Sequence, residues 1–186
     1  MKTLIFNGSP HKKGDAAALI SRLSAQLKGE VRVVDAWDGS IAPCNDCRFC
    51  STHDHCNIPD AMDGVYREIS AADNIVIASP LYFSELTGPL LSVLSRLQYF
   101  WIAQNVRKVR ALADKDRLGF VLLVGGGDGA PDKALSTAKT LLKHMGAKFM
   151  DCAVSHATDR MSAGSDPEAL ASVDRIARTM NSASID

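Results

Sequence analysis

The sequence predicts a doubly wound α/β fold, in which helices cover both faces of a parallel sheet. Short apolar runs that are typical of strands alternate along the chain with longer segments that carry apolar residues at helical spacing. Several of these runs are apolar throughout, as expected for strands buried on both faces. No internal repeat, linker or low-complexity segment interrupts the alternation. The pattern therefore predicts a three-layer sandwich.

The first half of the chain supplies three strands and two helices. The run KTLIFN predicts a buried strand at 2–7, and apolar residues at helical spacing predict a helix over 15–29 that ends at a glycine. The alternation in EVRVVDA predicts a second strand at 30–36. A helix is expected over 60–73, and the run NIVIAS predicts a third strand at 74–79.

The second half continues the alternation. A helix is expected over 88–102, because Pro89 suits a first turn, and the polar, basic segment 103–116 indicates a surface excursion. The run RLGFVLLVGGG predicts a fourth strand over 117–127 that ends in three glycines. The last three elements are a helix, a strand and a helix that Asp166 and Pro167 open, at 131–146, 147–155 and 166–180.

Five strands that alternate with helices predict one parallel sheet and a single domain over 1–186, with a cysteine-rich loop at 43–57. Two strand orders fit this pattern, 2-1-3-4-5 and the Rossmann order. In both, ligands bind at the carboxyl ends of the strands, near the point where the strand order reverses. The segments after strands one, three and four are therefore the candidate binding loops.

Composition narrows the function. The 21 basic residues balance 21 acidic ones, so neither a nucleic acid nor an anionic membrane is an expected partner. The apolar run near the N-terminus is too short for a signal peptide or a membrane span, and we expect a cytoplasmic protein. In that reducing compartment, clustered cysteines indicate metal, cluster or redox chemistry more than structural disulfides.

The loop after the first strand is a candidate phosphate site. Residues 7–17 form a Gly-Ser-Pro turn that leads into a helix, where backbone N–H groups, the hydroxyl of Ser9 and the charge of Lys12 or Lys13 can hold a phosphate. The segment lacks the spacing of a dinucleotide site or a P-loop, which favours a mononucleotide. The alternative is a strand-to-helix turn that binds nothing.

The other two candidate loops suit a flat ring. Tyr82 and Phe83 follow the third strand and can form a wall against a planar ligand, although core packing is the common role of such a pair. Gly125 to Gly127 follow the fourth strand and permit close approach of the backbone to such a ligand, or form a flexible turn. Together the three loops are a stronger indication than any one of them.

The run Cys44-x2-Cys47-x2-Cys50-x5-Cys56 is the most specific motif. Its first three cysteines have the spacing of cubane iron–sulfur clusters in ferredoxins, which favours a cluster. Zinc is the main alternative, because histidines 53 and 55 are possible ligands, but structural zinc usually draws its ligands from two separated pairs. An oxidation-derived disulfide and an empty loop are the others. Taken singly, the two histidines are interpreted as loop residues.

The sequence resembles the NADPH-dependent FMN reductase group of flavodoxin-like proteins. The resemblance rests on NGSPHKKGD, ASPLYFSELTGPLLSVLSRL and GGG, and the cysteine run is similar to that of the iron–sulfur flavoproteins in this group. It implies a flavodoxin-like sandwich of strand order 2-1-3-4-5 and a homodimer or homotetramer. It also implies FMN, with the phosphate at Ser9, His11, Lys13, Asp15, Ala16 and Ala17. The implied isoalloxazine contacts are Pro80, Leu81, Tyr82, Phe83, Gly125, Gly126 and Gly127. The implied ligands of a [4Fe-4S] cluster are Cys44, Cys47, Cys50 and Cys56.

One departure from the resemblance concerns the phosphate. Members of the group usually carry Asn and then Ser or Thr where this chain has Asp15 and Ala16, so a hydroxyl is missing and a carboxylate faces a dianion. The alternative is that Asp15 points outward and caps the helix, and reduced FMN affinity is the expectation in either case.

The expected function is FMN-dependent electron transfer between a reduced donor, NAD(P)H or ferredoxin, and a small acceptor, with no catalytic side chain assigned. A cluster-free NAD(P)H-dependent FMN or quinone reductase and a non-catalytic flavodoxin-like electron carrier are the alternatives. Three further features have simpler interpretations. Cys152 is expected to be a buried apolar residue, 99–102 core or a dimer contact, and the basic run 107–110 a solvated face or a patch that steers an acidic partner or the 2′-phosphate of NADPH.

Overall fold

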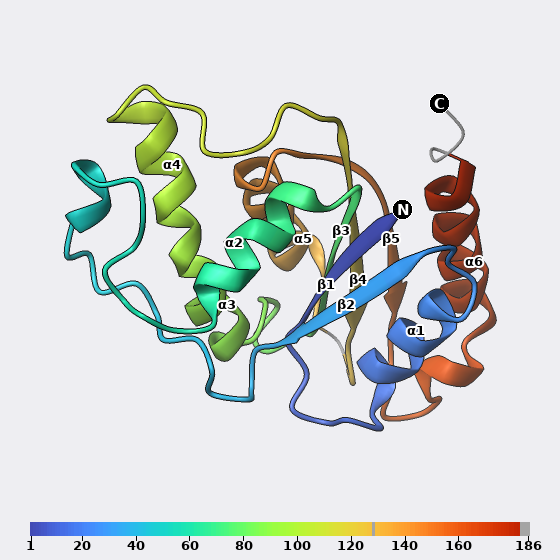
Figure 1. Cartoon of the computed structure of the whole chain (residues 1–186). Helices are drawn as coiled ribbons and strands as arrows, with labels where there is room; N and C mark the ends of the chain where they lie inside the picture. The colour runs from blue at the N-terminus through green and yellow to red at the C-terminus, as the bar shows by residue number, and fades with distance from the viewer. Residues whose placement is uncertain (128, 183–186) are drawn as a thin grey trace.

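The structure, a computed structural model, describes residues 1–127 and 129–182. Its five strands form one parallel sheet of order β2-β1-β3-β4-β5, which confirms the order 2-1-3-4-5 (Figure 1). The strands are β1 Lys2–Asn7, β2 Glu30–Asp35, β3 Asn74–Pro80, β4 Arg117–Val124 and β5 Ala147–Ser155.

Helices cover both faces of the sheet. They are α1 Asp15–Ser24, α2 Met62–Ala71, α3 Gly88–Leu94, α4 Gln98–Asn105, α5 Asp132–His144 and α6 Pro167–Ser182. Three short 3-10 turns are η1 Phe49–Ser51, η2 Ser95–Leu97 and η3 Ala163–Ser165. Figure 1 shows α1 and α6 on one face and the other helices on the opposite face. The layers are therefore those of a doubly wound sandwich.

Alternation along the strands divides the core into two clusters. In β1, Leu4 and Phe6 pack under α2, α3 and α5, whereas Ile5 between them packs under α1 and α6. All three side chains are buried, as the apolar runs predict. Because neighbouring residues of a strand point to opposite faces, each run of three or more apolar residues fills both core clusters.

Three predicted boundaries are wrong. The first helix ends at Ser24 instead of residue 29, and β4 ends at Val124, so the three glycines follow the strand. The helix expected over 88–102 is divided into α3, η2 and α4. At this break the carbonyl of Arg96 accepts a hydrogen bond from the Tyr66 hydroxyl at 2.9 Å. A carbonyl that would bond within one continuous helix thus accepts a hydrogen bond from a tertiary contact instead.

Other boundaries follow the local signals. Gly146, the expected end of α5, has φ +71°, the left-handed conformation that favours glycine at a helix end. Asp166 precedes α6, and its Oδ1 accepts hydrogen bonds from the N–H groups of Glu168 and Ala169.

Cys152 in β5 is half-buried against the core. Across residues 1–127 and 129–182, no helix has the length and apolar character needed to span a membrane.

Candidate functional site

The loop after β1 presents donors to a ligand. Ser9 is buried, its N–H donates to Asn7 Oδ1 at 3.0 Å, and its Oγ accepts from the N–H of His11 at 3.2 Å. Gly14 precedes α1, and no side chain caps this helix. The N–H groups of a first helical turn have no partner within the helix, so those of α1 are available to a ligand. His11 and Lys13 are exposed in the same loop.

The same loop is fixed by contacts that the sequence pattern does not predict. The carbonyl of Gly8 accepts two hydrogen bonds, from Trp37 Nε1 at 2.9 Å and from Thr87 Oγ1 at 2.8 Å. A Cβ at Gly8 would lie 2.8 Å from Leu90 Cδ2, so only glycine fits without displacing a neighbour. Segments that follow β2 and β3 thus position the turn that follows β1.

Asp15 does not cap α1, so the suggestion that it does is wrong. It is the first residue of the helix, and its Oδ1 accepts from the Ser162 hydroxyl at 2.9 Å and from the N–H of Ala163 at 2.7 Å. Its carboxylate therefore ties the helix start to the segment before α6. Ala16 is buried in the core and Ala17 is half-buried, so these two residues can offer a ligand little beyond their N–H groups.

The turn after β3 is strained and exposed. Tyr82 and Glu85 pair through two backbone hydrogen bonds, and the two residues between them, Phe83 and Ser84, both have positive φ, 54° and 61°. This is the conformation of a type I′ turn, which non-glycine residues adopt at a cost. The ring of Phe83 is fully exposed and Tyr82 is 44% exposed. Both rings are therefore available to a ligand or a partner.

The glycine run after β4 is partly closed by the chain itself. A Cβ at Gly126 would lie 2.6 Å from Asp159 Oδ1, and one at Gly125 would lie 3.2 Å from Leu81 Cδ1. Only Gly127 has open space around its Cα. Leu81 and the glycines thus form one packed edge, with Asp159 as a neighbour that the sequence pattern does not indicate. Residue 128 lies outside the described residues.

The cysteine loop gathers all four motif cysteines around one cavity. Cys44, Cys47, Cys50 and Cys56 line it together with Tyr66, Arg96 and Tyr99. Burial, and the neighbouring thiols of Cys56, Cys44 and Cys47, raise the pKa of the Cys50 thiol. Among the residues that the structure describes, no group of three or more His, Cys, Asp or Glu side chains is arranged to hold a single metal ion.

A buried ion pair joins the two ends of this loop. Arg96 NH1 lies 2.7 Å from Asp60 Oδ2, and the Arg96 side chain is fully buried. The same guanidinium donates to the carbonyls of Ala42 and Ile58, and Asp60 accepts from the N–H groups of Ala42 and Met62. Residues before Cys44 and after Cys56 are therefore attached to one side chain of the turn between α3 and α4.

The charges of this pair stabilise each other. Burial opposes ionisation of both groups, yet their hydrogen bond lowers the pKa of Asp60 and raises the pKa of Arg96. The Nε of Arg96 is buried without an acceptor in the described part of the chain. Arg96 lines the cysteine cavity, so an anionic group bound there would have a donor at hand. Sequence reasoning missed both residues, although an arginine on the apolar face of a predicted helix is a signal.

The two loop histidines do not line the cysteine cavity. The ring of His53 stacks on Phe49 at 3.7 Å, and His55 Nδ1 lies 3.0 Å from Asp54 Oδ1. Positive φ at Asp46 and Arg48 turns the backbone sharply around Cys47. The four thiols are thus the soft donors of this cavity.

Comparison with known proteins gives the family. The sequence matches the NADPH-dependent FMN reductase family over residues 1–159. An iron–sulfur flavoprotein of Methanosarcina thermophila is 28% identical over 141 residues, which are 74% of this chain and 70% of that protein.

Two solved structures support the fold. A flavone reductase superposes with a TM-score of 0.72 at 19% identity, over 100% of this chain and 64% of that chain. The chain thus spans less than two thirds of that reductase. An FMN-dependent NADH-azoreductase of Bacillus anthracis, in complex with FMN, has a TM-score of 0.62 at 15% identity, over 97% of this chain and 99% of that chain. With the match over residues 1–159, the chain belongs to the NADPH-dependent FMN reductase family, and this membership supports FMN as its cofactor.

Proposed function

We propose that the chain is an iron–sulfur flavoprotein, which passes electrons between a reduced donor, NAD(P)H or ferredoxin, and a small acceptor. The observation that carries this proposal is the cavity lined by four cysteine side chains at the same end of the sheet as the flavin loops. The printed name of the Methanosarcina thermophila relative supports it.

FMN fits the loops that follow β1, β3 and β4. The Ser9 hydroxyl and the first-turn N–H groups of α1 would hold its phosphate, with His11 and Lys13 beside them. The turn at Tyr82 and Phe83 and the open side of Gly127 would border its ring. Bound FMN would supply hydride and single-electron transfer. The protein contributes position and electrostatics, and we assign no acid or base to a side chain.

A [4Fe-4S] cluster fits the donor set of the cysteine cavity. Four thiolates are the ligands that such clusters take, and they would come from Cys44, Cys47, Cys50 and Cys56. The cluster would supply single-electron transfer. Arg96 lines this cavity, and its Nε–H, which has no acceptor in the described part of the chain, would be a donor available to a negatively charged cluster.

One observation favours a second candidate, the cluster-free NAD(P)H-dependent FMN or quinone reductase. The cavity between the cysteines measures only about 20 Å³, which is roughly the space of one water molecule. A cluster would require the loop to open, whereas a cluster-free reductase would not.

Anaerobic purification separates the two candidates. We expect flavin absorption together with broad cluster absorption, and about four iron and four acid-labile sulfide per chain. Cys50→Ser should lose the iron and keep the flavin, whereas Cys152→Ser, outside the loop, should keep both. Iron-free protein that still carries FMN would rule out the cluster, and protein that takes up no FMN would rule out the flavin assignment.

Two further measurements test the remaining parts of the proposal. Mixing with NADH or NADPH should bleach the flavin and start turnover with a quinone, which a pure electron carrier would not do. The homodimer or homotetramer stays a prediction, and light scattering during size-exclusion chromatography tests it. A monomer would exclude a site shared between subunits.

A further inference from the structure

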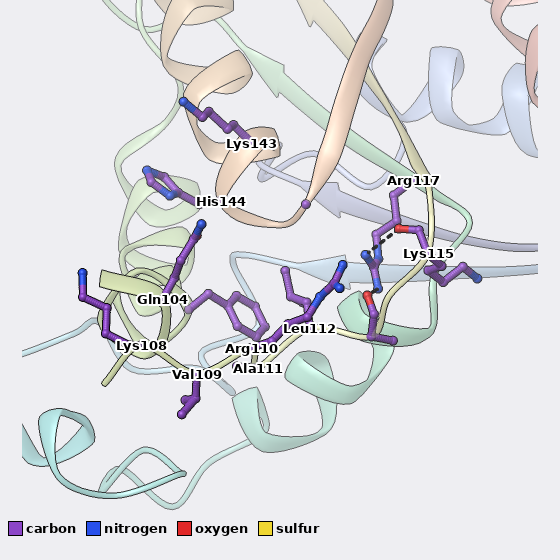
Figure 2. Close-up of a pocket in the computed structure, with 13 residues that line it drawn as sticks. Gln104, Lys108, Val109, Arg110, Ala111, Leu112, Lys115, Arg117, Lys143 and His144 are labelled. Atoms are coloured by element: carbon purple, nitrogen blue, oxygen red, sulfur yellow. Dashed lines mark hydrogen bonds between the residues drawn. The ribbon is translucent and has the colours of Figure 1, made fainter. Parts of the chain in front are cut away.

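A second cavity lies at the other end of the sheet from the flavin loops. It measures about 550 Å³ and borders Arg117, the first residue of β4, and Gly146, just before β5 (Figure 2). The flavin loops follow the last residues of the same strands. Its lining residues are Phe100, Gln104, Lys108, Val109, Arg110, Ala111, Leu112, Ala113, Lys115, Arg117, Lys143, His144 and Gly146.

The lining of this cavity is strongly cationic. Five of its thirteen residues are lysine or arginine, one is histidine, and none is aspartate or glutamate. The whole chain has a formal net charge of +0, so this cluster of positively charged side chains is a local feature. Cations that face a common space repel one another, and an anion bound there would relieve that repulsion.

Two of the lysines are available to a ligand. In the described part of the chain, the ammonium groups of Lys108 and Lys143 form no ion pair or hydrogen bond, and both residues are exposed. Lys115 pairs with Asp73, and Arg110 pairs with Asp114 at the surface. Figure 2 shows Lys108, Lys143 and His144 at one end of the cavity and Arg117 at the other.

Arg117 contributes a fixed positive charge. It is 3% exposed, and its guanidinium donates to the carbonyls of Ile69 and Ser70 at the end of α2 and to those of Lys115 and Ala113. No carboxylate lies among these partners. Burial, and then the charge of Arg110, lower the pKa of Arg117, while the charge of Asp73, the partner of Lys115, opposes them in part.

The cavity also has an apolar wall. Phe100 is 5% exposed, and Leu112 and Ala111 are half-buried beside it. A volume of about 550 Å³ lies within the range of small-molecule sites, which combine apolar walls with a few placed polar groups. A bare inorganic ion would use the cations and leave this wall uncovered.

We propose that this cavity binds an organic phosphate of about nucleotide size, with its phosphate among the cations and its ring against the half-buried Ala111 and Leu112. The eight residues of β4 span roughly 23 Å, so a ligand here would lie far from FMN and take no part in hydride transfer. The site is thus a second binding site and does not depend on the cluster.

The probe is AMP, added to the protein in saturating FMN at low ionic strength and followed by calorimetry. We expect one AMP per chain, weaker binding of inorganic phosphate, and none of adenosine. The double variant Lys108→Gln/Lys143→Gln should weaken AMP binding roughly tenfold, because it removes two exposed ion pairs with the phosphate. The control Lys28→Gln/Lys148→Gln removes two other exposed lysines and should bind AMP as the wild type does.

Three results would overturn the proposal. They are no AMP binding at millimolar concentration, equal binding of adenosine, and equal weakening by the control pair. An FMN titration of the same variants checks the other site, since the Lys108 and Lys143 substitutions should leave FMN affinity unchanged. Loss of FMN binding in the wild type would refute the proposed function and leave the AMP result interpretable, because the lysine variants locate the AMP.

Discussion

The phosphate loop, residues 8–14, and the segment between β2 and α2 that contains the cysteine loop, residues 36–61, leave the same end of the sheet but are built differently. The first is seven residues long and offers mainly backbone N–H groups, shaped by hydrogen bonds between residues two positions apart. The second is 26 residues long and offers side chains, held by contacts of Arg96 that reach 36 and 54 positions along the chain. Both loops thus use distant contacts: Trp37 and Thr87 hold one carbonyl of a phosphate loop that is otherwise shaped locally, whereas Arg96 holds both ends of the cysteine segment.

The largest expected effect comes from the anchor of the cysteine loop. Asp60→Asn leaves the buried Arg96 guanidinium without its counter-charge, and we expect the free energy of unfolding to fall by about 3 kcal/mol. Urea titration measures this loss, and iron content after anaerobic purification should fall with it. The control is Asp174→Asn in the exposed Arg22 pair, which should cost much less stability than Asp60→Asn because water screens that pair.

The Asp60→Asn variant can also show that the two loops do not differ in this way. If Asp60→Asn loses stability but keeps full iron content, the cysteines hold their arrangement without the anchor. The cysteine loop would then be as locally determined as the phosphate loop.

Sequence patterns predict the phosphate loop better than the cysteine loop, because more of the contacts that shape the phosphate loop lie close together in the chain. A strand, a Gly-Ser-Pro turn and a helix follow from local periodicity, and the strand order then places the loops after β1, β3 and β4 together. Spacing also predicts that Cys44 to Cys56 gather around one space. It does not predict Arg96, because burial of a charge depends on Asp60, which lies 36 positions away.

Thr87→Val tests how far the phosphate loop depends on a distant contact. The variant removes one of the two hydrogen bonds to the Gly8 carbonyl and keeps the shape of the side chain. We expect FMN to bind up to roughly fivefold more weakly, since one such bond contributes about 1 kcal/mol. Flavin fluorescence titration measures the affinity, with Thr140→Val, whose exposed hydroxyl donates to Ser136, as control. Unchanged affinity would mean that Trp37 and the backbone suffice.

Asp15→Asn should have a smaller effect of opposite sign. The amide oxygen of asparagine can still accept from Ser162 and Ala163, while the negative charge beside the phosphate is lost. We expect FMN affinity to rise by a few-fold, as for a single charge at a helix end, and the gain should shrink as salt is added. Equal affinity at all salt concentrations would show that the carboxylate already faces away from the ligand.

Two missed features of the flavin side have a different origin. Trp37 and Asp159 come from the segments after β2 and β5, and each donates a hydrogen bond to the carbonyl of a glycine, Gly8 and Gly126 respectively. The periodicity of apolar residues along the sequence cannot predict such a contact. The positive φ angles of Phe83 and Ser84 are also hidden, because the sequence there shows neither glycine nor asparagine.

The last prediction concerns how the unfolding free energy depends on pH, where the two loops should differ although the effect near neutral pH is the smallest. The hydrogen bonds from Arg96, Ala42 and Met62 outweigh burial and lower the pKa of Asp60. A carboxyl with a lowered pKa in the folded state stabilises the fold at every pH above its ordinary value, and this contribution is lost as the pH falls through the folded pKa. The difference in unfolding free energy between wild type and Asp60→Asn should therefore stay constant from pH 8 to 5 and shrink only below about pH 4.

Thr87→Val removes no titrating group, so its difference from wild type should stay constant throughout. Urea unfolding at each pH measures both, and a difference for Asp60→Asn that shrinks between pH 7 and 5 would mean that the pKa of Asp60 is raised, with burial outweighing its hydrogen bonds.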